Sequence, residues 1–155
     1  MSKKIVLLSA AIAVVFSIAF AGDAPWFDMK KCAMCKSLTE TPGLMESMNY
    51  EQLNISNGIV CLTTVKGDQL KTYRDAHGKM KEVFARLEKG EAVDLCGSCN
   101  AFGMIMMKGV KQDYAETRQG DVWIVTSDKP EVVAELQGWA KRNSEEMAKM
   151  KTATP

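Results

Sequence analysis

Two Cys-x-x-Cys motifs that stand 64 residues apart constrain the fold of this chain more than any other feature of its sequence. The four cysteines are Cys32, Cys35, Cys96 and Cys99. A second similarity supports the first: segment 57–64 aligns with segment 119–126 at an offset of 62, with matching Gly, Val and Thr residues. Similarity at a nearly fixed spacing is typical of an internal duplication. We therefore predict two repeats, at about residues 29–90 and 93–150.

Each repeat has the local signals of a β-hairpin. An Asn-Gly pair at 57–58 is a strong turn signal, and a Gln-Gly pair at 119–120 is its weaker counterpart. The segments that follow, about 59–65 and 121–127, are rich in β-branched residues, which favour strands. We expect each of these segments to be the second strand of a hairpin.

A long amphipathic helix is predicted after each hairpin. Apolar residues recur at steps of three and four, which places them on one helix face. The first stripe comprises Leu70, Tyr73, His77, Met80, Phe84 and Leu87, and the second comprises Val133, Leu136, Ala140, Asn143, Met147 and Met150. The predicted fold class is α+β: a duplicated strand-turn-strand-helix unit forms a four-stranded antiparallel sheet with two long helices on one face. A short Cys-x-x-Cys segment precedes each unit.

The two faces of the predicted sheet are both apolar. We expect Val60, Leu62, Val122 and Ile124 to face the helices. The opposite face then carries Cys61 and Trp123, and it is too apolar to be left exposed. Either the segments after each cysteine pair cover it, including Phe102, Met104, Ile105 and Met107, or a homodimer forms through the face near Cys61 and Trp123.

The N-terminus predicts export. Two lysines precede a nearly uninterrupted apolar run over 5–20, which ends in a small-x-small cleavage pattern at 19–21. We predict a signal peptide at 1–21 and a single domain at 22–155. No second apolar run of that length follows, so we expect no stable membrane insertion after cleavage. The protein would be periplasmic in a Gram-negative bacterium and secreted otherwise.

Charge and motifs argue against several functions. The chain has 20 basic and 19 acidic residues, and the basic residues are scattered, so we expect no nucleic-acid partner. It has one histidine, which excludes two-histidine zinc hydrolase motifs, and it lacks nucleophile-elbow and phosphate-loop signatures. We therefore expect a protein that is not an enzyme.

The cysteines indicate a metal site. If the repeats are related by a twofold axis, equivalent Cys-x-x-Cys turns can meet near that axis. Four cysteines that meet there form the closed tetrahedral set that structural Zn²⁺ sites favour. We predict that Cys32, Cys35, Cys96 and Cys99 bind a metal ion of the zinc type.

Two alternatives from other classes stay open. An exported protein meets oxidising conditions, so the same cysteines could form disulfides that staple an interaction module. A Cys-x-x-Cys motif could also serve a thiol–disulfide oxidoreductase or its redox partner. The sequence around each motif does not match the strand that precedes the motif in thioredoxin-like folds.

Three further residues could bind a metal. His77 lies on the first helix stripe near Met80, and Cys61 is the fifth cysteine. Imidazole, thioether and thiolate ligands together suit copper, which makes copper a minor alternative to zinc. The simpler interpretation is that His77 and Cys61 belong to the core, and that methionines fill gaps in packing.

Overall fold

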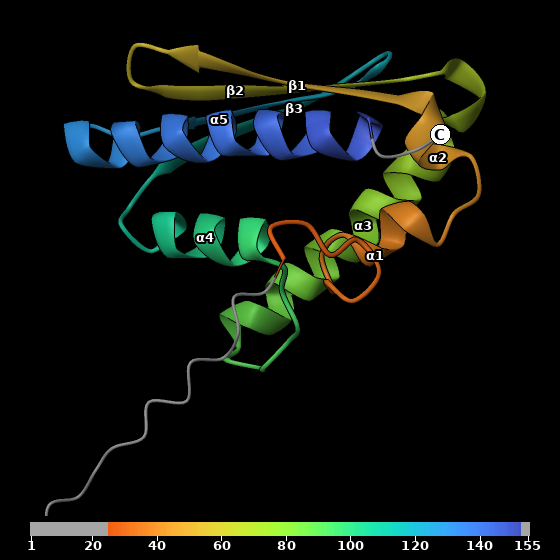
Figure 1. Cartoon of the computed structure of the whole chain (residues 1–155), viewed down its shortest axis with the longest axis horizontal. Coiled ribbons are helices and arrows are strands. Elements are labelled where there is room, and N and C mark those ends of the chain that lie inside the picture. Colours follow the sequence, from red (N-terminus) through yellow and green to blue (C-terminus); the bar gives the residue numbers. More distant parts are fainter. Residues whose placement is uncertain (1–24, 153–155) are drawn as a thin grey trace, which may run out of the picture.

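A computed structural model describes residues 25–152 of the 155-residue chain (Figure 1). Its four strands are β1 (Met48–Ile55), β2 (Gly58–Val65), β3 (Lys111–Thr117) and β4 (Gly120–Thr126). They form one antiparallel sheet in the order β1-β2-β4-β3. The α+β class and the four-stranded antiparallel sheet agree with the sequence prediction, whereas the predicted signal peptide lies outside the described residues.

Five α-helices and one 3₁₀ turn accompany the sheet within the described residues. They are α1 (Lys36–Thr39), α2 (Leu44–Ser47), η1 (Gly67–Gln69), α3 (Leu70–Glu88), α4 (Gly97–Met106) and α5 (Pro130–Thr152). The two long helices predicted from the apolar stripes are α3 and α5. None of the helices in residues 25–152 is both long and apolar enough to cross a bilayer.

The main core lies between the sheet and helices α4 and α5. Ile59 and Cys61 of β2 and Val125 of β4 are almost fully buried against Leu136 of α5 and Ile105 of α4. The helices therefore cover the face that carries Cys61 and Trp123. Our prediction that the Val60 face points at the helices is wrong. Strand periodicity separates two faces, but because both are apolar here it does not determine which one is covered.

The other face of the sheet carries Val60, Leu62, Val122 and Ile124, which are half-buried. No helix of the described residues lies over this face (Figure 1). Because Cys61 is only 1% exposed, the face near it is not free to bind a second copy of the chain. The homodimer itself is not tested by the structure and stays a prediction.

Only α5 of the two long helices lies along the sheet, where it contacts β1 and β2. Helix α3 meets the sheet through its first turns and then runs obliquely away from it (Figure 1). Near its start, Tyr73 is buried in a second core cluster with Leu44 and Val65. Farther along, Phe84 is 41% exposed. The expectation of two long helices packed on one face thus describes α5 well and only the first half of α3.

Two glycines fix the pairing of the central strands. Gly58 lies opposite Thr126, and Gly120 lies opposite Thr64. A Cβ atom added at Gly58 would lie 2.0 Å from a backbone carbonyl oxygen of β4, and one added at Gly120 would lie 1.9 Å from a carbonyl oxygen of β2. Both positions need glycine because the neighbouring strand approaches too closely for a side chain. Each glycine is the first residue of its strand, and the hairpin turn comes just before it.

Candidate metal centre

The first Cys-x-x-Cys motif forms a tight turn that leads into α1. The backbone N–H of Cys32 donates to the carbonyl of Asp28 at 3.0 Å, and the N–H of Lys31 donates to the Asp28 carboxylate at 3.0 Å. Within the motif, the N–H groups of Cys35 and Lys36 both donate to the carbonyl of Cys32. These bonds turn both cysteine side chains of the motif toward the same side.

The second motif forms the first turn of α4. Cys96 has an extended backbone and immediately precedes the helix, and Cys99 lies in the first turn. The N–H of Asn100 donates to the carbonyl of Cys96 at 2.9 Å. The corresponding bond in the first motif joins Lys36 to Cys32, so the two motifs share a backbone hydrogen bond at equivalent positions.

Backbone hydrogen bonds tie the two motifs together. The N–H of Ala33, inside the first motif, donates to the carbonyl of Asp94 at 2.8 Å. In return, the N–H of Gly97, inside the second motif, donates to the carbonyl of Pro25 at 3.0 Å, and the N–H of Ser98 donates to that of Trp26 at 2.9 Å. The segment before the first motif thus serves as a backbone partner for the second.

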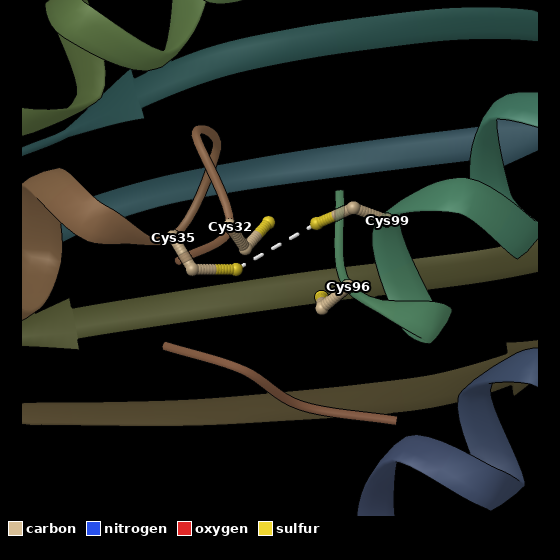
Figure 2. A group of neighbouring side chains, drawn as sticks. All are labelled: Cys32, Cys35, Cys96 and Cys99. Atoms are coloured by element: carbon tan, nitrogen blue, oxygen red, sulfur yellow. Dashed lines mark hydrogen bonds between the residues drawn. The ribbon is translucent and has the colours of Figure 1, made fainter. Parts of the chain in front are cut away.

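The structure brings together all four cysteines that the sequence singled out (Figure 2). Their four Sγ atoms lie within 4.8 Å of one another, and those of Cys35 and Cys99 are 3.6 Å apart. A tetrahedral site with Zn–S bonds of about 2.3 Å places its sulfur atoms about 3.8 Å apart. A disulfide bond is about 2.05 Å long, and all five cysteines of the chain are free thiols here. The spacing therefore fits a shared metal ion.

The cluster is shielded from solvent. Cys32 and Cys96 are each 1% exposed and Cys35 is 9% exposed, whereas Cys99 is half-buried. Apolar side chains pack around the sulfur atoms, and these are Met29, Met34 and Leu95. A dry surrounding strengthens electrostatic attraction between thiolates and a cation.

The four thiols shift one another's pKa values. Hydrogen bonds, first that with Cys35, lower the pKa of Cys32 to about 6, and hydrogen bonds led by that with Cys32 lower the pKa of Cys96. Hydrogen bonds to Cys32 and Cys96 raise the pKa values of Cys35 and Cys99, and burial adds to the rise. The four thiols therefore do not all ionise together unless a cation compensates the added charge. A divalent metal supplies that compensation.

A buried polar network connects the second motif to α5. Ser98 and Asn143 are 4% and 3% exposed, and the Ser98 hydroxyl donates to Oδ1 of Asn143 at 2.8 Å. The indole N–H of Trp26 donates to the same oxygen at 2.9 Å, and that of Trp139 donates to the Ser98 carbonyl at 3.1 Å. The network holds the first turn of α4, which carries Cys99, against α5 and the segment before the first motif. Sequence reasoning missed this network, although a polar Asn143 in an otherwise apolar stripe was a signal for it.

The remaining candidate ligands lie elsewhere. Cys61 is buried on β2, where burial raises the pKa of its thiol and Gln52 donates to its sulfur at 3.6 Å. His77 and Met80 are half-buried on α3. Among residues 25–152, the one group of histidine, cysteine and carboxylate ligands close enough to share an ion is the four-cysteine cluster, and it contains neither His77 nor Cys61. The copper alternative therefore stays a prediction.

A second polar cluster surrounds Asp121, and sequence reasoning did not predict it. Asp121 of β4 is 5% exposed, and its Oδ2 accepts hydrogen bonds from Tyr73 at 2.5 Å and from Tyr114 at 3.1 Å. The Tyr114 hydroxyl lies 3.2 Å from Nδ1 of His77, whose ring stacks between the two tyrosines. Burial, together with Asp121, raises the pKa values of Tyr73 and Tyr114. Burial lowers the pKa of His77.

Comparison with known proteins gives no match, neither to family models nor to curated proteins nor to solved structures. The function must therefore be argued from the geometry of the site.

Proposed function

We propose that this chain is an exported metal-binding protein in which Cys32, Cys35, Cys96 and Cys99 hold one zinc-type ion. The observation that carries the proposal is the gathering of four sulfur atoms within 4.8 Å from two motifs 64 residues apart. Four thiolates in a dry environment form the ligand set of structural zinc sites. The ion is held without an open coordination position, so its role is to fix the structure around it.

The proposal includes an internal duplication, which strand pairing supports. Each position on β2 has a counterpart on β4 that is 62 residues later. When every position is replaced by its counterpart, the pairs between the two strands map onto one another, and Cys61 and Trp123 form the central pair. The hydrogen bonds that flank the pair follow the same rule: the N–H of Val65 donates to Gln119 at 2.7 Å, and that of Ser127 donates to Asn57 at 3.0 Å. Such symmetry explains how one Cys-x-x-Cys from each repeat reaches a common ion.

A thiol–disulfide oxidoreductase fits the site less well. Reactive cysteines are partially exposed, as access to the partner disulfide requires. The first cysteines of the two motifs, Cys32 and Cys96, are each 1% exposed. The two motifs also face one another, which leaves neither free to receive a substrate.

Metal content and thiol reactivity test the proposal. The exported protein is purified without chelator or added metal, and its metals are measured by mass spectrometry. We expect about one zinc ion per chain, as one tetrahedral four-cysteine site requires. We also expect thiols that react with an alkylating reagent only after a chelator is added. Cobalt(II) in place of zinc should give the charge-transfer spectrum of a four-thiolate site.

Matched variants locate the site. Cys32→Ser should lose the metal, whereas Cys61→Ser should retain it, because Cys61 is buried elsewhere on β2. A protein without metal that has only one free thiol would contradict the proposal. That result would favour the disulfide-stapled module, with Cys61 as the unpaired cysteine.

A further inference from the structure

Asn143 is a buried amide in the apolar stripe of α5. Its side chain is 3% exposed, and the stripe positions before it, Leu136 and Ala140, carry apolar side chains that are equally buried. A buried amide costs free energy unless its polar atoms are hydrogen-bonded. Oδ1 of Asn143 has two donors, the Ser98 hydroxyl at 2.8 Å and the indole N–H of Trp26 at 2.9 Å. One oxygen atom of α5 therefore holds one residue from each of the two segments that carry the cysteines.

Ser98 fixes the second motif to this oxygen. It lies between Cys96 and Cys99 in the sequence and is 4% exposed. Its backbone N–H donates to the carbonyl of Trp26 at 2.9 Å, and its hydroxyl donates to Asn143. Because Ser98 is bonded directly to Cys99, the backbone of that ligand cannot shift without a shift of Ser98.

Trp26 fixes the segment before the first motif. Its indole N–H is bound to Asn143, and the guanidinium of Arg142 lies 3.8 Å from the centre of its ring. A cation over an aromatic face is attracted to it, so two adjacent residues of α5 hold the same indole. Two positions after Trp26, the carbonyl of Asp28 accepts from the N–H of Cys32. The hold on Trp26 is thus close to the start of the first Cys-x-x-Cys turn.

We infer that Asn143 is a positioning residue of the metal centre: its Oδ1 joins Ser98 and Trp26, and the affinity of the four cysteines for their ion depends on that junction. The inference rests on the proposed function, because the affinity for the metal is the quantity that Asn143 changes. Asn143 does not touch the ion, and it acts through the two segments that carry the ligands.

The effect on affinity follows from the difference between two forms of the protein. A substitution changes metal affinity only if it weakens the metal-bound form more than the metal-free form. Under the proposed function the ion orders the segment that contains Ser98, and without the ion its hydroxyl and the Trp26 N–H reach water. Loss of the Asn143 acceptor then leaves two buried donors unpaired mainly in the metal-bound form. Residues that support metal ligands typically change metal affinity about ten- to a hundredfold when they are substituted.

Competition with a chromophoric chelator tests the inference. The full mature chain and Asn143→Leu are titrated with zinc, and we expect the Kd of the variant to be about ten- to a hundredfold higher. The matched control is Leu136→Ala, on the same helix but in the main core with Ile59 and Val125. It removes buried apolar volume and so lowers stability, yet its Kd for zinc should equal that of the native sequence where circular dichroism shows the metal-free form folded. A native Kd for Asn143→Leu would overturn the inference, and so would an equal loss of affinity in Leu136→Ala.

A double-mutant cycle distinguishes positioning from a general loss of structure. Ser98→Ala removes the donor of the same hydrogen bond, so it should also raise the Kd for zinc. Because the two residues act through one bond, the double variant should lose less affinity than the product of the two separate fold-changes. Losses that multiply in full would overturn the inference. If Asn143→Leu fails to fold, Ser98→Ala compared with Leu136→Ala decides the question.

Tryptophan fluorescence gives a readout that does not depend on a binding curve. Chelation of the native protein should shift the emission to longer wavelength, because the indole N–H of Trp26 loses Asn143 and meets water. Asn143→Leu, measured first at saturating zinc, already lacks that acceptor and should show a smaller shift. An equal shift in both proteins would overturn the inference. A native protein that binds no zinc contradicts the proposed function, whereas a native protein that binds zinc no more tightly than Asn143→Leu contradicts only the role of Asn143.

Discussion

The four cysteines and the cluster around Asp121 both place ionisable groups in the interior, but the two regions balance their charge differently. Asp121 has two phenol donors, Tyr73 at 2.5 Å and Tyr114 at 3.1 Å, so its carboxylate is hydrogen-bonded by the chain itself. The cysteines have mainly one another. With all four ionised they would carry like charges within 4.8 Å of one another.

The difference indicates which of the two regions depends on a bound ion. A buried polar group that is fully hydrogen-bonded stabilises a fold by itself, whereas a buried group of like charges requires a counter-ion. The Asp121 cluster joins α3 to β4 and needs no ligand for that role. The cysteine cluster joins the segment before α1 to the start of α4, and its thiolates are neutralised only when a cation binds.

Removal of the metal should therefore change one region and spare the other. At a free zinc concentration 1,000 times the Kd, metal binding stabilises the folded state by about 4 kcal/mol, and a chelator removes this contribution. Hydrogen exchange should show loss of protection in residues 28–39 and 94–100. Protection in β2 and β4 should persist, because the Ile59–Val125 core does not contain the cysteines.

The control for this experiment is Cys32→Ser, which lacks a complete metal site and should respond little to chelator. Uniform loss of protection, in the sheet as much as around the cysteines, would contradict the separation between the two regions. It would show that the sheet depends on the metal as well.

A substitution at Asp121 should instead weaken the Asp121 cluster and leave the metal site intact. Asp121→Ala leaves the buried Tyr73 hydroxyl without its acceptor, and an unsatisfied buried group that had bonded to a charge costs about 2–4 kcal/mol. Chemical denaturation measures the loss, and the zinc content should stay unchanged. Asp113→Ala on the exposed strand β3 is the matched control, with an expected effect within about 0.5 kcal/mol. Loss of zinc from Asp121→Ala would show that the two regions are coupled.

The sequence predicted the parts of this fold that depend on local pattern. The β-branched segments at 59–65 and 121–127 correspond to β2 and β4, and the two apolar stripes correspond to α3 and α5. The gathering of four cysteines was also predicted, on the hypothesis that a repeat relates one motif to the other. These predictions required only periodicity and spacing along the chain.

The parts that the sequence did not predict depend on contacts between distant segments. Asp121 was predicted only as the first residue of a strand segment, and its burial depends on Tyr73, which lies 48 positions away in the sequence. Trp26 belongs to the site because its carbonyl accepts from Ser98 and because α5 places Asn143 beside its indole N–H. The face of the sheet was assigned wrongly because both faces are apolar. Tertiary packing decided each of these points.

The pH dependence of stability gives the smallest expected effect and examines the Asp121 cluster alone. Burial lowers the pKa of His77 below its ordinary value of 6.5; Lys81 lowers it further, and Asp121 and Glu116 oppose the shift. In the unfolded chain His77 binds a proton as the pH falls through 6.5, while in the folded chain it stays neutral until a lower pH. Stability contributed by neutral His77 is therefore fully present above pH 6.5 and decreases on acidification.

His77→Gln should remove this dependence. We expect the difference in unfolding free energy between the native sequence and His77→Gln to be constant above about pH 7 and to decrease toward pH 5, the range in which an unperturbed histidine gains its proton. Both proteins are measured with saturating zinc, so acid effects on the cysteines cancel in the difference. A difference that instead increases on acidification would mean that Asp121 and Glu116 dominate and that folded His77 is the stronger base. The Asp121 cluster would then depend on the positive charge of protonated His77. It would differ from the cysteine cluster only in that the chain itself supplies that positive charge.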